Sequence, residues 1–170
     1  GMRYALDNGA WSAHIRGEQF NPTKFNKALE KVGGGADWIV LPDIVAGGLE
    51  SLELSLSWLD RVSYFGLPLL PVQDGMNPQD VSPHVSREVG IFLGGSTDWK
   101  LETMREWGAL ARRKEAYFHV ARVNSAKRIV LCSDAGAHSI DGTSVSRFGS
   151  TLRRLDLALR QGHLFPGGLR

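Results

Sequence analysis

Cysteine is almost absent from this sequence: Cys132 is the only one among 170 residues. A single cysteine cannot form a disulfide within the chain, and it cannot supply a CxxC or cysteine-rich zinc site. The five histidines show no HxH or HxxxH spacing, so they form no recognisable metal-binding pattern. We therefore expect neither a metal nor another cofactor, and a chain without disulfides fits a reducing, cytoplasmic location.

Long hydrophobic runs are also missing. No apolar stretch approaches the ~20 residues that a membrane-spanning helix needs, and no basic segment followed by an apolar one resembles a signal peptide. The charge is nearly balanced, with 20 Lys and Arg against 18 Asp and Glu, for a net charge of +2. This balance permits contact with an acidic polymer without requiring it, and we expect no membrane partner.

What the sequence does contain is a regular alternation of short apolar runs with longer amphipathic ones. The short runs predict strands at residues 3–7, 38–43, 67–74, 89–95, 116–123 and 138–142. Helical spacing predicts helices at residues 22–32, 49–62, 78–85, 99–113, 126–134 and 146–160. Pro22 and Pro78 suit first helical turns, and Thr97 or Asp98 can cap the fourth helix. The alternation predicts a parallel sheet, because parallel neighbours need a crossover that a helix supplies.

Two architectures fit six such units: a doubly wound sheet and an incomplete (β/α)8 barrel of the TIM type. The position of the polar residues favours the barrel, because nearly every predicted strand ends on one. These residues are Asp7, Asp43, Gln73, Asp74, Gly94, Gly95, Arg122, Asn124 and Asp141. One such residue alone is more often a helix cap or a turn residue, but the strand ends of a barrel converge on one pocket. We therefore predict an α/β fold, an incomplete barrel with about six βα units.

The predicted rim carries the residue types needed for chemistry at a sugar carbon. Two carboxylates from different strands, Asp141 and Asp7, provide a nucleophile for the anomeric centre and a group that moves a proton. Other polar residues match the edge of a purine, since a carboxylate accepts from N–H groups while an amide or a backbone N–H donates to a carbonyl oxygen. The residues with these chemistries are Asp43, Gln73, Gly94 and Gly95.

At these residues the sequence resembles the tRNA-guanine transglycosylase superfamily, and within it the small DpdA-like proteins associated with 7-deazaguanine modification of DNA. The matching segments, in chain order, are DNGAW at 7–11, LPD at 41–43, VQDG at 72–75, IFLGGS at 91–96 and SID at 139–141. Each motif is short, but five of them follow in the family's order between residue 4 and about residue 148. The resemblance therefore covers nearly the whole chain.

The resemblance implies a reaction, which is the exchange of guanine in DNA or tRNA for a 7-deazaguanine base. Asp141 would be the nucleophile that forms a covalent glycosyl-enzyme, and Asp7 would be the general acid/base. The family's base-reading positions correspond to Asp43, Gln73, Gly94 and Gly95. Trp11 follows the Asp7 turn, where its ring can stack on a base.

The family's zinc site has no counterpart here, since Cys132 lies before Asp141 and no second cysteine exists. A complete barrel has eight strands, so the resemblance implies that residues 2–170 form a single TIM-barrel-like domain that lacks the first strands of a full barrel. An open barrel exposes strand edges, and we expect a homodimer or another partner to cover them.

Contacts to a nucleic-acid backbone are expected from basic residues in or just beyond the loops of the predicted rim. These are Arg122, Lys127, Arg128 and Arg147, the last at the position of an arginine in the family motif. Ordinary surface charge also explains each of them. A duplex substrate would have to present its target base flipped out.

Three functions remain open at the level of sequence. The first is base exchange in DNA or RNA, and the second is a non-catalytic barrel remnant that binds purines or nucleic acid. The third is an unrelated phosphate-binding enzyme that uses Gly94 and Gly95 as a phosphate loop. Two further residues are expected to be structural: His119 as a core histidine with satisfied hydrogen bonds, and Cys132 as a buried small side chain.

Overall fold

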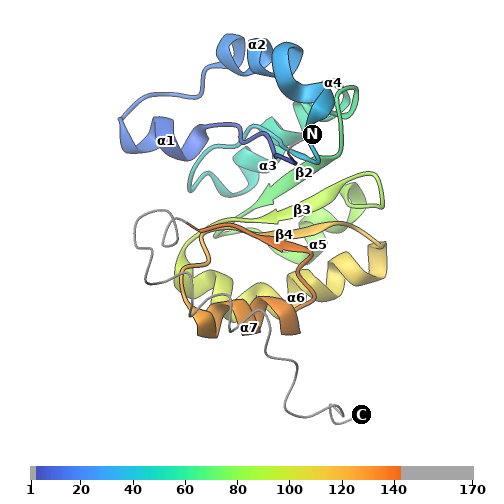
Figure 1. Cartoon of the computed structure of the whole chain (residues 1–170). Helices are drawn as coiled ribbons and strands as arrows, with labels where there is room; N and C mark the ends of the chain where they lie inside the picture. Colours follow the sequence, from blue (N-terminus) through green and yellow to red (C-terminus); the bar gives the residue numbers. More distant parts are fainter. Residues whose placement is uncertain (1–2, 143–170) are drawn as a thin grey trace.

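The computed structural model describes residues 3–142, in which a parallel sheet forms the centre of the fold (Figure 1). The strands are β1 (Ile39–Val40), β2 (Pro68–Val72), β3 (Gly90–Leu93), β4 (Phe118–Val120) and β5 (Ser139–Ile140). Every neighbouring pair is parallel, as the alternation of strands and helices predicts. Leu6 adds a parallel bridge to Ile39 and so places the first predicted strand beside β1.

The order of the strands in the sheet is the order of the chain, β1-β2-β3-β4-β5. A doubly wound sheet reverses direction at a switch point, and the described strands contain no such reversal. The sheet instead curls into a half-barrel (Figure 1). The predicted mixed α/β fold with a parallel sheet is therefore confirmed, in a shape compatible with an incomplete barrel.

Two helices have the bounds that the sequence predicts. In α2 (Pro22–Val32), Asn21 is the N-cap and its side-chain oxygen accepts from the Lys24 N–H at 2.9 Å. In α7 (Ala126–Asp134), the Ser125 hydroxyl accepts from the Arg128 N–H. Both helices begin with a polar cap that satisfies a free backbone donor, which is the signal that sequence reasoning detects most directly.

The single helix predicted at 49–62 is two helices, α3 (Gly48–Ser57) and α4 (Leu59–Ser63). Trp58 lies between them, and its N–H donates to the Ser55 carbonyl at 3.1 Å, a contact three residues back that tightens the turn. The Trp58 ring packs edge-on against Phe20 and Phe25. Tertiary packing of this ring accompanies a break that helical spacing does not reveal.

Three other helices differ from the prediction at their ends or in their presence. The helix α5 (Pro78–Val81) gives way to a 3-10 turn, η2 (Ser82–His84), where Pro83 has no N–H to continue an α-helix. The long helix α6 (Thr97–Lys114) begins earlier than predicted, with Ser96 as its N-cap. A short helix, α1 (Ala10–Ile15), is missing from the prediction because its 6 residues make fewer than two turns, too few to show helical periodicity.

The paired parts of the strands are shorter than the predicted ranges. Residues 3–7 contribute the bridge at Leu6 and a hydrogen bond from the Asp37 N–H to the Tyr4 carbonyl. In the 38–43 segment the last hydrogen bond to β2 runs from the Leu41 N–H to the Leu69 carbonyl, before Pro42. A 3-10 turn, η1 (Gly33–Gly35), connects α2 to this segment. The helix predicted at 146–160 lies outside the described residues.

Alternate residues of the strands face opposite sides of the half-barrel. Leu70, Ile91 and Phe118 belong to the main hydrophobic core, where α6 and α3 pack on the sheet. The residues between them face the other way, and there the ring of Phe92 stacks on the ring of His119 at 5.0 Å. Cys132 is buried in the core on α7, as predicted.

None of the helices in residues 3–142 has both the length and the apolar character that crossing a membrane would require.

Candidate active site at the carboxyl ends of the strands

A cavity of about 830 Å³ lies where the strands end. Parallel strands bring their carboxyl ends to one edge, so side chains far apart in the sequence meet there. The predicted site residues on its wall are Asp7, Trp11, Asp43, Gln73, Gly94, Gly95, Arg122 and Asp141. The structure thus brings these predicted positions together around one cavity.

Asp141 follows β5 and is held at both carboxylate oxygens. Its Oδ1 accepts from the backbone N–H of Arg122 at 2.7 Å, and its Oδ2 lies 3.1 Å from Nε2 of His119. Partial burial raises the pKa of this carboxyl, but the hydrogen bonds from His119 and Arg122, together with nearby positive charge, outweigh burial and lower it. Asp141 is therefore an ionised carboxylate with a fixed orientation and a half-exposed side chain.

Asp43 is in the opposite electrostatic situation. Burial raises its pKa to about 6, the Asn8 amide opposes this rise with a hydrogen bond at 2.7 Å, and the charge of Asp7 adds to it. Asn8 also donates to the Leu41 carbonyl at 2.6 Å, which ties the segment after the first predicted strand to the segment after β1. Asp43 thus has one side-chain donor and spare acceptor capacity facing the cavity.

Asp7 lies at the junction of two cavities. It lines the main one and also a second cavity of about 500 Å³ between α1 and α2. Its Oδ1 accepts from the Gly9 N–H at 3.2 Å, and Gly9 adopts a left-handed conformation with φ 76° that starts α1. The segment therefore turns immediately after the carboxylate and leaves Asp7 exposed at the mouth of the cavity.

Gln73 is engaged within the protein. Its amide oxygen accepts from the Ala46 N–H at 2.7 Å, and its amide nitrogen donates to the Ile44 carbonyl at 2.8 Å. Ala46 has a positive φ of 58°, which a non-glycine residue adopts only where surrounding contacts impose it. Gln73 therefore shapes the loop after β1 that carries Asp43.

The turn after β3 is occupied by a carboxylate from the protein itself. Asp74 accepts from both the backbone N–H and the hydroxyl of Ser96, each at 2.6 Å. Burial raises the pKa of Asp74, but these hydrogen bonds outweigh it, and the pKa is lowered. Ser96 is the N-cap of α6, so a phosphate at this helix end would meet a fixed negative charge. This arrangement disfavours the phosphate-loop alternative.

Arg122 connects the two sides of the cavity. Its guanidinium carbon lies 4.5 Å from the centre of the Trp11 ring, and one of its nitrogens donates to the Gly95 carbonyl. Like Ala46, it has a positive φ of 58°. Lys127 and Arg128, which the sequence also predicts as phosphate contacts, do not line this cavity, and Arg128 borders a small cavity beside Lys100 instead. Arg147 lies outside the described residues.

Three residues of this region are missing from the predicted site, namely Asn8, Lys100 and His119. Lys100 is buried on α6 and donates to the Ala121 carbonyl at 2.5 Å, and burial lowers its pKa to about 8. His119 has its hydrogen bonds satisfied, as expected, but one partner is Asp141. The register of β4 against β5 brings His119 close to Asp141, and no sequence motif predicts that register.

No protein-family model and no curated protein matches the chain. Within residues 3–142, no group of three or more His, Cys, Asp or Glu side chains is placed to hold a metal ion.

Proposed function

We propose that this protein is a base-exchange glycosyltransferase that replaces guanine in DNA or tRNA with a 7-deazaguanine base. In this proposal the half-barrel is an incomplete TIM-type (β/α)8 barrel with about six βα units, related to the tRNA-guanine transglycosylases and their DpdA-like members. No cofactor takes part. The reaction needs a nucleophile, a proton carrier and a reader of the base, and each has a candidate on the cavity wall.

The observation that carries the proposal is the contrast between Asp141 and Asp43 in one cavity. Asp141 is ionised and held at both oxygens, as a nucleophile requires. Asp43 is a largely buried carboxyl group with one side-chain donor, and its pKa is raised to about 6. Two carboxyl groups with such different environments suit two different tasks.

An Asp141 oxygen forms a bond to C1′ of the nucleotide, the bond from C1′ to guanine breaks, and its electron pair leaves with the base. Asp7, which is open to solvent, takes up a proton from water and passes it to the departing base. The incoming 7-deazaguanine then loses its ring proton to Asp7 as its nitrogen attacks C1′ and displaces Asp141. Asp7 returns this proton to water and ends as the carboxylate with which it began.

Recognition of the base is assigned to Asp43 and to the ring of Trp11. A carboxylate accepts from the ring N–H and the amino group of guanine, and Asp43 has the free acceptor sites. The side chain of Trp11 lies at the cavity and is 46% exposed, so it offers an aromatic surface for stacking. Gly94, Gly95 and Gln73 complete this wall.

A second function is favoured by one observation, which is the engagement of Gln73. Both ends of its amide bond to the loop at Ile44 and Ala46, so it offers no free donor to a base in this conformation. A barrel remnant that binds purines without exchanging them would have such a reduced reading site.

The test is incubation of the protein with single-stranded DNA, duplex DNA and tRNA in the presence of radiolabelled guanine or a labelled 7-deazaguanine. Base exchange predicts label in one of the polymers, and no label with the Asp141→Asn variant. The binding function predicts that guanine binds to the wild-type protein without any incorporation into a polymer.

A further inference from the structure

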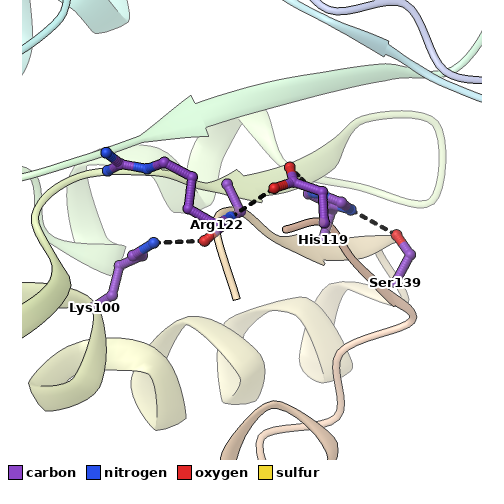
Figure 2. Close-up of polar contacts among 6 residues, drawn as sticks. Lys100, His119, Arg122 and Ser139 are labelled. Atoms are coloured by element: carbon purple, nitrogen blue, oxygen red, sulfur yellow. Dashed lines mark hydrogen bonds and ion pairs between the residues drawn. The ribbon is translucent and has the colours of Figure 1, made fainter. Parts of the chain in front are cut away.

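A line of polar contacts crosses the last two described strands behind Asp141. The hydroxyl of Ser139 lies 2.7 Å from Nδ1 of His119, and Nε2 of His119 lies 3.1 Å from Asp141 (Figure 2). The register of the sheet explains this line, because His119 pairs with Ser139, and Asp141 is two residues further along on the same face. His119 therefore contacts two side chains, that of Ser139 on β5 and that of Asp141 just after β5.

The groups at the two ends of this line determine which imidazole nitrogen of His119 carries the hydrogen. The ionised Asp141 carboxylate can only accept, so Nε2 of His119 carries the hydrogen in their contact. In a neutral imidazole Nδ1 is then an acceptor, and Ser139 donates to it. Asp141 thereby selects the tautomer, and the Ser139 hydroxyl satisfies the Nδ1 acceptor that this tautomer leaves on the other side of the ring.

Packing fixes the imidazole plane. His119 is 1% exposed, and Phe92 stacks on it with an interplanar angle of 13°. The Trp38 ring lies 4.6 Å from it between centroids. A ring held among such neighbours cannot turn freely, so the direction of its Nε2–H is set by the fold.

The second oxygen of Asp141 is fixed by a different route. The Arg122 N–H that binds it belongs to a turn with positive φ, and Lys100 binds the preceding carbonyl, that of Ala121 (Figure 2). The carboxylate thus receives one donor on each oxygen. Its remaining lone pairs are available on the cavity side.

We propose that His119 and Ser139 are positioning residues that orient the Asp141 carboxylate for attack on the sugar carbon, with His119 in the Nε2–H tautomer. This inference rests on the proposed function for its catalytic meaning. Neither His119 nor Ser139 lines the cavity, so neither is placed to touch the substrate. Ser139 has no role as a nucleophile in this arrangement.

The kinetic test compares two substitutions of similar size. His119→Gln keeps a donor near the place of Nε2, whereas His119→Asn keeps a polar group near Nδ1 and loses the donor to Asp141. We expect kcat for base exchange to fall about 10–100-fold in His119→Asn with little change in KM, and to recover largely in His119→Gln. Equal losses in the two variants at equal thermal stability would overturn the positioning role.

A second measurement does not need activity. Nitrogen-15 NMR of the wild-type protein reports which imidazole nitrogen of His119 carries the proton, and we expect Nε2 protonated and Nδ1 bare at neutral pH. Ser139→Ala should weaken this tautomer preference, and Asp141→Asn should change the Nε2 signal most. A proton on Nδ1 alone would contradict the inference. If the wild-type protein shows the expected tautomer but exchanges no base, the proposed function fails while the hydrogen-bonded line stands.

Discussion

The Arg122 guanidinium lies over the Trp11 ring, with its central carbon 4.5 Å from the ring centre. Trp11 is on α1, after the first predicted strand, whereas Arg122 follows β4 near the opposite end of the sheet. The contact therefore joins two distant parts of the half-barrel across the cavity. Because Arg122 also donates its backbone N–H to Asp141, the contact links the stacking surface to the proposed nucleophile.

Substitution of Trp11 tests this contact. Trp11→Ala removes both the cation–π interaction and the stacking surface, and we expect guanine affinity to fall about tenfold, since base stacking is worth about 1–3 kcal/mol. Trp11→Phe keeps a ring and should lose much less. Isothermal titration of the variants with guanine gives the comparison, and equal affinity of Trp11→Ala and the wild type would contradict the assignment.

Asp43→Asn should stabilise the protein in a pH-dependent way. The pKa of Asp43 in the folded state is about 6, above its ordinary 3.8, so the folded state disfavours the ionised form. Above pH 6 Asp43 is ionised in the folded and in the unfolded protein, and the loss of folding free energy caused by its burial is then complete. This loss disappears toward pH 4, where the carboxyl group becomes protonated. We expect a gain of about 1–3 kcal/mol at pH 8 that vanishes at pH 4.

Urea unfolding of the wild type and Asp43→Asn across this pH range measures the effect. The same variant should lose guanine affinity at pH 8, since a carboxylate offers two acceptor oxygens to the two adjacent N–H groups of guanine, whereas an amide offers one oxygen and a repelling NH2 donor. If the variant is less stable than the wild type at pH 8, the folded protein does not destabilise the ionised form of Asp43, and the prediction is wrong.

Gly95→Ala should destabilise the turn after β3. Gly95 has φ +73°, and a Cβ there would lie 2.6 Å from Oδ2 of Asp74 and 2.8 Å from the Trp99 ring. An alanine would have an unfavourable backbone conformation, and its Cβ would clash with Asp74 and Trp99. We therefore expect the free energy of unfolding to fall by about 1–3 kcal/mol. Gly34→Ala is the control, because nothing lies within 4 Å of its Cβ position and its φ is not positive. Similar losses in thermal melts of the two variants would refute this account of Gly95.

The described sheet has unpaired edges at β5 and at the segment of Leu6. Exposed edges favour pairing with another chain, and we predict a homodimer or another covering partner. Light scattering at increasing protein concentration should show a mass above that of one chain. A single-chain mass at the highest concentration would count against the homodimer.

Polar residues at the ends of strands form a visible pattern, and the sequence therefore predicts the parallel sheet and much of the cavity wall. Asp7, Asp43 and Asp141 each end an apolar run, and the sheet brings those ends to one edge. The sequence does not predict the hydrogen bonds of Gln73 to the loop at Ala46, because they depend on a loop conformation with positive φ. The sequence also does not predict the pairing of His119 with Ser139, because the register of two strands depends on how they pack together in the fold.

The most direct test of the central claim is a search for the covalent intermediate. Wild-type protein is incubated with the polymer substrate without an incoming base, digested with protease and nuclease, and analysed by mass spectrometry. The account predicts a peptide in which Asp141 carries a sugar that has lost its guanine, absent from Asp141→Asn. A wild-type protein that exchanges labelled base while no such peptide forms, or forms it at another residue, would contradict the assignment of Asp141 as nucleophile.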